Sequence, residues 1–343
     1  MIEQSVWHPV ALSANVVDKP LPALLQGQAL VLWRDAQGAV HAWADKCPHR
    51  GAKLSLGRVV HVRREVSTGQ ASSVVDAHST LECAYHGWQF GAAGRCTLVP
   101  AMPDFAPPAT HGATVFGACE AHGLVWVQLH ADAAQRIPRF AAGDDAGLRQ
   151  VHCGPYDVAT SAPRVVENFL DMAHFGFVHE GYLGARDATA LVDYVVTETA
   201  QGPVATGCRA WQPRSHALAA SGADVSYSYA VVAPYCAVLT KIPDAHPMAT
   251  PHRESIALWV CPVSPEASRV WFSLAVTDFS IAEQSLRDFQ DTIFLQDKPI
   301  LESQSPALLP LDPRAELHTA ADKMSAAYRR YLRGLGITYG VIP

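Results

Sequence analysis

The chain has 343 residues, of which 49% are hydrophobic and 17% charged, and its formal net charge is −6. This length accommodates two domains with a large core, and the low charged fraction is compatible with apolar surface buried between subunits. The acidic balance, without a basic run, argues against nucleic-acid binding. No signal peptide and no apolar run of membrane-spanning length is present, so we expect a cytoplasmic protein without a membrane partner.

Residues 1–150 are predicted to form a small all-β domain. Short β-like runs are separated by Gly, Pro and Asp, and AQG and AAG are typical of hairpin turns. The runs are ALVLWRD (29–35), AVHAWAD (39–45), HGWQFGAAG (86–94) and HGLVWVQLH (122–130). The Pro-rich segment 99–109 is interpreted as an extended surface strap.

Residues 151–343 are predicted to form an α+β domain with an antiparallel sheet. A helix is expected at VENFLDMAHFGFV (166–178), with Pro163 near its start and Gly181 after it. Alternating runs indicate strands at 190–199, 225–240, 255–263 and 269–279. Helical spacing predicts one helix over 283–303 and a last one over 319–336, capped by Gly334 or Gly336.

The chain has eight cysteines, which in the absence of a secretion signal indicate a reducing compartment. Cys47 and Cys83 each have a histidine two or three residues further on. The other six are interpreted as buried free thiols; they are Cys96, Cys119, Cys153, Cys208, Cys236 and Cys261.

Two short loops, CPHRG (47–51) and CAYHGW (83–88), each carry one cysteine and one histidine. Thiolates suit iron–sulfur clusters or zinc, and zinc fingers usually pair Cys with Cys and His with His. The mixed pairs therefore favour a [2Fe–2S] cluster, with Cys47 and Cys83 on one iron and His49 and His86 on the other. A structural zinc site, or side chains merely packed in a β core, are the alternatives.

A second candidate site lies in NFLDMAHFGFVH (168–179). His174 and His179 are five residues apart, so they converge only if the helix ends or bulges between them, which Gly176 would permit. Two histidines and a carboxylate on one face of a metal, with other positions open, are typical of non-haem Fe(II) oxygenases.

Both sites resemble those of the Rieske non-haem iron oxygenases, whose catalytic motif reads N-x2-D-x2-H-x4-H. The resemblance covers nearly the whole chain and is strongest to homotrimeric monooxygenases. HEGYLG (179–184) and residues 327–341 are similar to saxitoxin-type alkaloid hydroxylases. KLSLG (53–57), LVPA (98–101) and QDKPILESQ (296–304) are similar to methylxanthine N-demethylases. Dicamba and vanillate O-demethylases are more distant.

The resemblance implies a helix-grip (START-like) catalytic domain and a mononuclear Fe(II) held by His174, His179 and Asp297. Asp291 is the competitor for the third position, although capping or pairing on its own helix is the preferred interpretation for it. Asn168 would lie beside the iron. Asp171 would link His174 to a Rieske histidine of a neighbouring subunit, with His86 favoured over His49. The alternative for Asp171 is a pair with Arg164.

The implied activity is O2-dependent hydroxylation or oxidative N- or O-demethylation of a small, (hetero)aromatic or nitrogen-containing substrate. Electrons would come from NADH through a separate reductase, with or without a ferredoxin, because no G-x-G-x-x-G follows a predicted strand. Alternatives are a cis-dihydroxylating dioxygenase, a non-catalytic Rieske electron carrier with a ligand-binding domain, and a zinc-stabilised binding protein.

Two further features have open interpretations. The gap between His49 and Cys83 is about twice the expected length, and residues 61–80 are interpreted as a lengthened surface loop or as a contact with a subunit or electron donor. Aromatic and apolar side chains of the second domain are expected to line a substrate pocket, core packing being the alternative for each. They are Tyr182, Trp211, Tyr235, Leu239 and Trp259.

Overall fold

The computed structural model describes residues 1–68, 71–214, 221–244 and 253–343. The chain forms two compact units, Gln4–Ile137 and Pro138–Pro343, and Met1–Glu3 belongs to the second. The boundary expected at residue 150 falls at the start of an edge strand of the second unit, so residues 138–150 lie with that unit. None of the helices in the described ranges is long and apolar enough to cross a membrane.

The first unit contains a six-stranded sheet with the order β1-β10-β9-β4-β3-β2 and a four-stranded sheet with the order β5-β6-β7-β8. The predicted strand runs around Trp33, Trp43 and Trp126 are confirmed, and these three rings are fully buried. The strands are β1 (His8–Leu12), β2 (Leu21–Leu25), β3 (Gln28–Arg34), β4 (Val40–Ala44), β5 (Arg58–Thr68), β6 (Ala71–Glu82), β7 (Gln89–Gly91), β8 (Cys96–Leu98), β9 (Val115–Ala121) and β10 (Leu124–Gln128).

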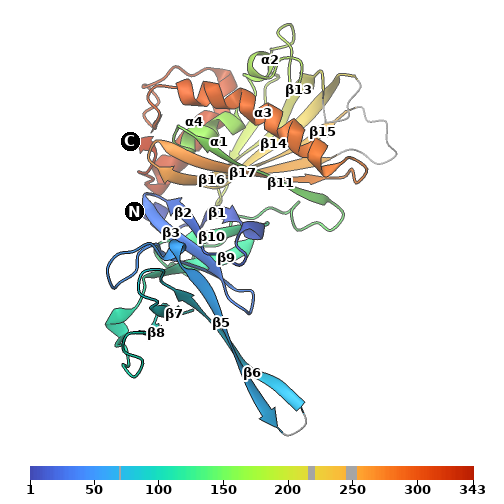
Figure 1. The fold of residues 1–343 in the computed structure, drawn as a ribbon. Helices are drawn as coiled ribbons and strands as arrows, with labels where there is room; N and C mark the ends of the chain where they lie inside the picture. Colours follow the sequence, from blue (N-terminus) through green and yellow to red (C-terminus); the bar gives the residue numbers. More distant parts are fainter. Residues whose placement is uncertain (69–70, 215–220, 245–252) are drawn as a thin grey trace. The chain divides into compact units, whose positions relative to one another are not determined.

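Strands β5 and β6 form a long hairpin where a surface loop was predicted, so that prediction was wrong. They pair antiparallel from Arg58–Glu82 to Thr68–Ala71, and Figure 1 shows the hairpin extending from the rest of its unit. The segment RVVHVRREVST is rich in Val and Thr, which favour strands. Its interspersed charged residues conceal this in the sequence. Residues 69–70 lie outside the described ranges.

The second unit is α+β, as predicted. Its antiparallel sheet has seven strands in the order β11-β17-β16-β15-β14-β13-β12. The strands are β11 (Arg149–Val158), β12 (Val195–Glu198), β13 (Pro203–Gln212), β14 (Ala223–Ala233), β15 (Cys236–Pro243), β16 (Glu254–Ser264) and β17 (Ala267–Val276). The sequence did not indicate β11 and β13, because Gly154–Pro155 and Gly207 interrupt their alternation with bulges.

Helices cover one face of this sheet (Figure 1). They are α1 (Ala162–Leu170), α2 (Phe175–Val178), α3 (Glu283–Ser303) and α4 (Lys323–Leu335), and β18 (Leu309–Pro310) pairs with β19 (Val341–Ile342). Of the two predicted caps of the last helix, Gly336 is the one used, with φ of 71°. The predicted start at Thr319 instead caps a 3-10 turn, Ala320–Asp322, that precedes α4.

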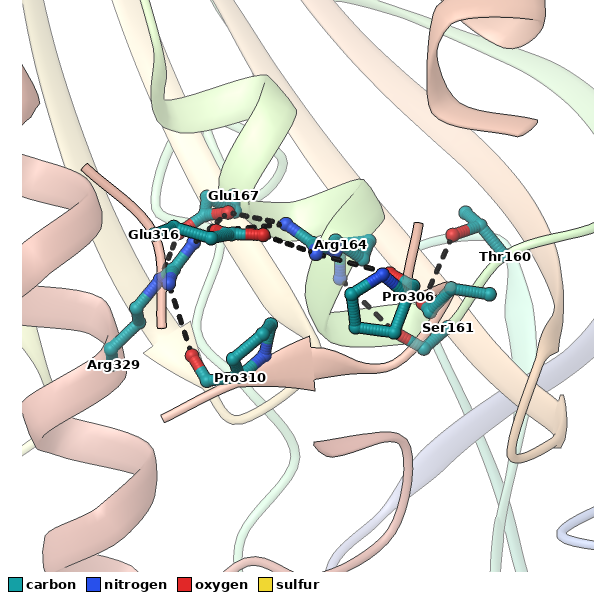
Figure 2. A network of polar contacts seen from close by, with 9 residues as sticks. Thr160, Ser161, Arg164, Glu167, Pro306, Pro310, Glu316 and Arg329 are labelled. Atoms are coloured by element: carbon teal, nitrogen blue, oxygen red, sulfur yellow. Dashed lines mark hydrogen bonds and ion pairs between the residues drawn. The ribbon is translucent and has the colours of Figure 1, made fainter. Parts of the chain in front are cut away.

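A buried network of four charged side chains fixes α1 to α4 (Figure 2). Arg329 on α4 donates to Glu167 on α1 at 2.6 and 2.8 Å, and its guanidinium also reaches Glu316. Arg164 on α1 donates to the other oxygen of Glu316 at 2.6 Å. Two positive and two negative charges thus neutralise one another; the side chain of Glu316 is 30% exposed, whereas the other three are largely buried, so breaking the Arg329–Glu167 pair would leave a buried charge uncompensated. The network holds the helix whose last turn leads to the second candidate site.

Candidate metal centres

The two Cys–His loops of the first unit have matching backbone geometry. In each loop the cysteine N–H donates to the carbonyl five residues further on, at 2.7 Å for Cys47 and 2.9 Å for Cys83. Each cysteine carbonyl accepts from the glycine four residues on, at 2.9 Å from Gly51 and 3.0 Å from Gly87. Both glycines have φ near 70°, which side chains with a Cβ rarely adopt. Two such turns present their four side chains to a common space.

The side chains of these loops suit a cluster better than a single ion. Cys47 and Cys83 are each 2% exposed, and burial raises the pKa of the Cys47 thiol to about 11. A bound metal would stabilise the thiolate form. The rings of His49 and His86 lie side by side, with centroids 4.7 Å apart. Four ligands of one zinc ion would all lie within about 4 Å of one another. Among the described residues, three or more such ligand atoms lie within 4.8 Å of one another only at the second site, so the side chains of the two loops are not grouped as one zinc ion requires.

The two histidines of the second site flank a single helical turn. Helix α1 ends at Leu170, and α2 is only four residues long, with His174 directly before it and His179 directly after it. The helix predicted over 166–178 is interrupted, but the interruption lies before His174 and not between the two histidines as expected. Gly176 does not form a bulge: a Cβ there would lie 2.8 Å from the carbonyl oxygen of Ala185, so the glycine permits close packing.

Asp297 on α3 completes the group. Its Oδ1 lies 3.2 Å from Nε2 of His179 and 3.5 Å from Nε2 of His174, and the three ligand atoms lie within 4.8 Å of one another. Asn168 donates to the same oxygen at 3.3 Å. Asp291, the competing candidate, instead accepts a hydrogen bond from Tyr156 on β11; the interpretation that it caps or pairs on its own helix was wrong. Two imidazoles and one carboxylate can hold a divalent iron here.

Asp171 fixes His174. Its carboxylate accepts from Nδ1 of His174 at 2.7 Å and from the backbone N–H groups of Ala173 and His174 at 3.0 and 3.2 Å. Burial opposes both charged forms, yet the hydrogen bond between the side chains lowers the pKa of Asp171 and raises that of His174. The alternative pairing with Arg164 is wrong, because that guanidinium is bound to Glu316.

Gln296 has the corresponding role for His179, and the sequence did not indicate it. Its Oε1 lies 2.9 Å from Nδ1 of His179, which is 1% exposed. Each histidine therefore has Nδ1 engaged by a neighbouring oxygen and Nε2 directed at Asp297, the arrangement that orients metal-binding imidazoles. The one available signal was its position directly before Asp297.

An apolar cavity adjoins this site. Its walls come from α1, α3 and strands β14 to β17, and they include His174, His179 and Asp297. Aromatic rings make up much of the wall, namely Phe169, Phe175, Tyr227, Tyr229, Phe272, Phe289 and Phe294. We call it the central cavity. A flat ring compound could be held against such a surface.

Of the five residues predicted to line a substrate pocket, only Leu239 lies in the wall of the central cavity. The strand alternation excludes Trp259, because Ile256 and Leu258 of β16 face the cavity and Trp259 faces the opposite side, packing on Phe140. Trp211 is 41% exposed and pairs with Asp224.

Tyr235 and Tyr182 do not line the central cavity either. Tyr235 lies in the turn between β14 and β15, where its hydroxyl donates to the carbonyl of Tyr339 at 3.0 Å. Tyr182 packs beside the ring of Phe289, so it supports the cavity wall without forming part of it. Aromatic composition alone cannot distinguish the inner face of a sheet from its outer face or its turns.

The fold and the two sites define a two-domain iron–sulfur oxygenase. Residues 6–141 match the Rieske [2Fe-2S] domain, and residues 158–336 match the vanillate O-demethylase oxygenase C-terminal domain. The chain belongs to the Rieske non-haem iron oxygenases, and its cofactors are a [2Fe–2S] cluster and a mononuclear iron.

The chain is similar to methylxanthine demethylases. The probable methylxanthine N7-demethylase NdmC of Pseudomonas sp. (strain TJI-51) is 40% identical over 225 residues, 64% of this chain and 77% of NdmC. The methylxanthine N1-demethylase NdmA of Pseudomonas putida is 30% identical over 336 residues, 96% of this chain and 88% of NdmA. The structure of P. putida CBB5 NdmA with caffeine superimposes with a TM-score of 0.78 at 28% identity, covering 97% of this chain and 90% of NdmA.

Replacement of Gln296 tests its hold on His179. We expect Gln296→Leu to weaken iron binding at the second site about 10- to 100-fold, because the imidazole loses the oxygen that orients it. Iron affinity is measured by competition with a chelator. Gln284→Leu, an exposed change on the same helix, should leave affinity unchanged; equal affinities for both variants would contradict the role of Gln296.

Proposed function

We propose that this chain is the oxygenase component that removes an N-methyl group from a small heteroaromatic ring of the methylxanthine type. The observation that carries the proposal is the central cavity, which has aromatic walls and the His174–His179–Asp297 group in one of them. The similarity to methylxanthine N1- and N7-demethylases supports this substrate class.

Polar groups in the cavity support a heterocycle over a plain aromatic ring. Gln290 on α3 lines the cavity and is 7% exposed, and its amide forms no hydrogen bond to any described residue. An amide both donates and accepts, so it can bind a ring nitrogen or a carbonyl of the substrate. Leaving such a group unpaired costs free energy, which a purely hydrocarbon ring would not recover.

We assign His174, His179 and Asp297 as the iron ligands, and Cys47, Cys83, His49 and His86 as ligands of the [2Fe–2S] cluster. Bound in these sites, the iron supplies O2 activation and the cluster supplies electrons. The protein's side chains bind and position the substrate and the ligands. The aromatic walls exclude water and hold the ring, and Asn168 orients the carboxylate of Asp297.

The net reaction inserts one oxygen atom into a C–H bond of the N-methyl group. The other oxygen atom leaves as water, with two electrons and two protons supplied to the protein. The N-hydroxymethyl product then loses formaldehyde, and the ring nitrogen takes up the hydroxyl proton. The electrons come from NADH through a partner reductase, with or without a ferredoxin; the chain itself has no G-x-G-x-x-G motif after a strand.

We further propose a homotrimer in which Asp171 connects the two kinds of site between chains. Asp171 keeps a side-chain exposure of 25% while bonded to His174, so part of the carboxylate remains open to a second imidazole. The second imidazole would be His86 of the partner subunit. His86 is exposed on its loop, as this pairing requires. A reducing compartment such as the cytoplasm fits a chain whose eight cysteines form no disulfide in the structure.

Formaldehyde release tests the proposed reaction. Purified protein with both metals, a compatible reductase and NADH is given a panel of methylxanthines under O2. We expect one formaldehyde for each O2 consumed with at least one member of the panel, and none when the reductase is omitted. A hydroxylated product that retains its methyl group, or turnover of aryl methyl ethers alone, would overturn N-demethylation.

Asp171→Asn tests the bridge between subunits. The amide keeps the shape of the side chain but removes the charge and one acceptor, so we expect about a 10- to 100-fold loss of turnover with both metal sites still occupied. Metal content, cluster reduction by the reductase and product formation are measured on the same sample. Normal turnover, or loss of iron in step with activity, would contradict the bridging role.

A further inference from the structure

A buried ion pair lies in the wall of the central cavity. Lys241 on β15 and Glu254 on β16 are paired across the strands, with Nζ 2.7 Å from Oε2 and side-chain exposures of only 4% and 8%. Both side chains line the cavity. The next inward-facing cross-strand pair is Leu239 and Ile256, so the charges interrupt an otherwise apolar face.

Stability of the sheet does not account for this pair. Taking two charges out of water is expensive, and well-packed apolar residues in place of a buried ion pair are often neutral or stabilising. A lysine ammonium has three N–H donors and a carboxylate has two acceptor oxygens. Beyond the ion pair itself, neither side chain forms a hydrogen bond with any described residue. Two donors and one oxygen therefore have no partner among the described residues, and both side chains line the cavity.

The neighbouring rings confine what can reach these groups. Nζ of Lys241 lies 5.8 Å from the centroid of Phe289, which also lines the cavity, and Tyr227 is the cross-strand neighbour of Lys241 on β14. A ligand that meets the ion pair is thus held between aromatic surfaces. It must offer an acceptor to the ammonium and a donor to the carboxylate within one short edge.

We infer that Lys241 and Glu254 recognise a –C(=O)–NH– edge of the substrate, as found in lactams and cyclic imides. The carbonyl oxygen accepts from Lys241, and the adjacent ring N–H donates to Glu254. The inference rests on the proposed function and sharpens it: the substrate keeps an unmethylated ring N–H beside a carbonyl. A fully methylated xanthine such as caffeine has no ring N–H, so it leaves the carboxylate oxygen unpaired.

Binding measurements test the inference without turnover. Calorimetric titration of the protein with both metals compares monomethylxanthines, which have free ring N–H groups, with caffeine. We expect the wild type to bind at least one monomethylxanthine about tenfold or more tightly than caffeine. In Lys241→Met/Glu254→Leu, that preference should fall to within about threefold, through weaker binding of the N–H ligand.

Matched variants control for structural effects. Arg269→Met/Asp157→Leu removes an exposed ion pair between β17 and β11 of the same sheet and should keep the preference. Glu254→Gln keeps the shape of the side chain and serves if the double variant does not fold. It should reduce the preference, since the neutral amide accepts more weakly than the carboxylate.

The outcomes separate this inference from the proposed function. Formaldehyde release from methylxanthines by a wild type that binds caffeine equally well would overturn the inference and leave the function standing. Binding of other lactams or imides, lost in the variants, with no methylxanthine bound, would support the inference and overturn the substrate class. The inference on Lys241 and Glu254 is overturned if the double variant keeps the wild-type preference, or if the wild type binds no ligand with a ring N–H.

Discussion

The carboxylate of Asp297 must meet two imidazoles that come from a distant part of the chain, and the arrangement of the second unit follows from this constraint. Helix α1 ends just before His174, and the buried network of Arg164, Glu167, Glu316 and Arg329 ties that helix to α4. Asn168, in the last turn of α1, then reaches the carboxylate itself. The hydrogen bond of Asn168 to Asp297 thus joins α1, which is held to α4, with α3.

Side chains next to the proposed iron ligands orient them. Asp171 and Gln296 each engage Nδ1 of one histidine, so both Nε2 atoms are directed at Asp297. At the Cys–His loops the corresponding constraint comes from the backbone, where two glycines with positive φ close equivalent turns. Each centre is thereby shaped before a metal is bound, which reduces the reorganisation that binding requires.

The sequence predicted what depends on short spacing. The Cys–His loops, the His174–His179 pair, the helix of Asp297 and the strands with regular alternation follow from local pattern. Prediction from the sequence failed where contacts between distant parts of the chain determine the structure. The strands β5 and β6 carry charges that resemble a loop, and Trp259 faces the outer side of its sheet. Gln296 and the Lys241–Glu254 pair have no local signature, because their roles come from residues that are remote in the chain.

Iron stoichiometry of an Asp297→Ala protein tests the central assignment most directly. Total iron, acid-labile sulfide and the electron paramagnetic resonance spectrum of the reduced protein are measured beside the wild type and Asp291→Ala. We expect Asp297→Ala to lose one iron per chain but to keep the sulfide and the rhombic cluster signal, whereas Asp291→Ala keeps all its iron. Full iron content in Asp297→Ala, or loss of the cluster signal together with the iron, would show that Asp297 is not a ligand of the mononuclear iron.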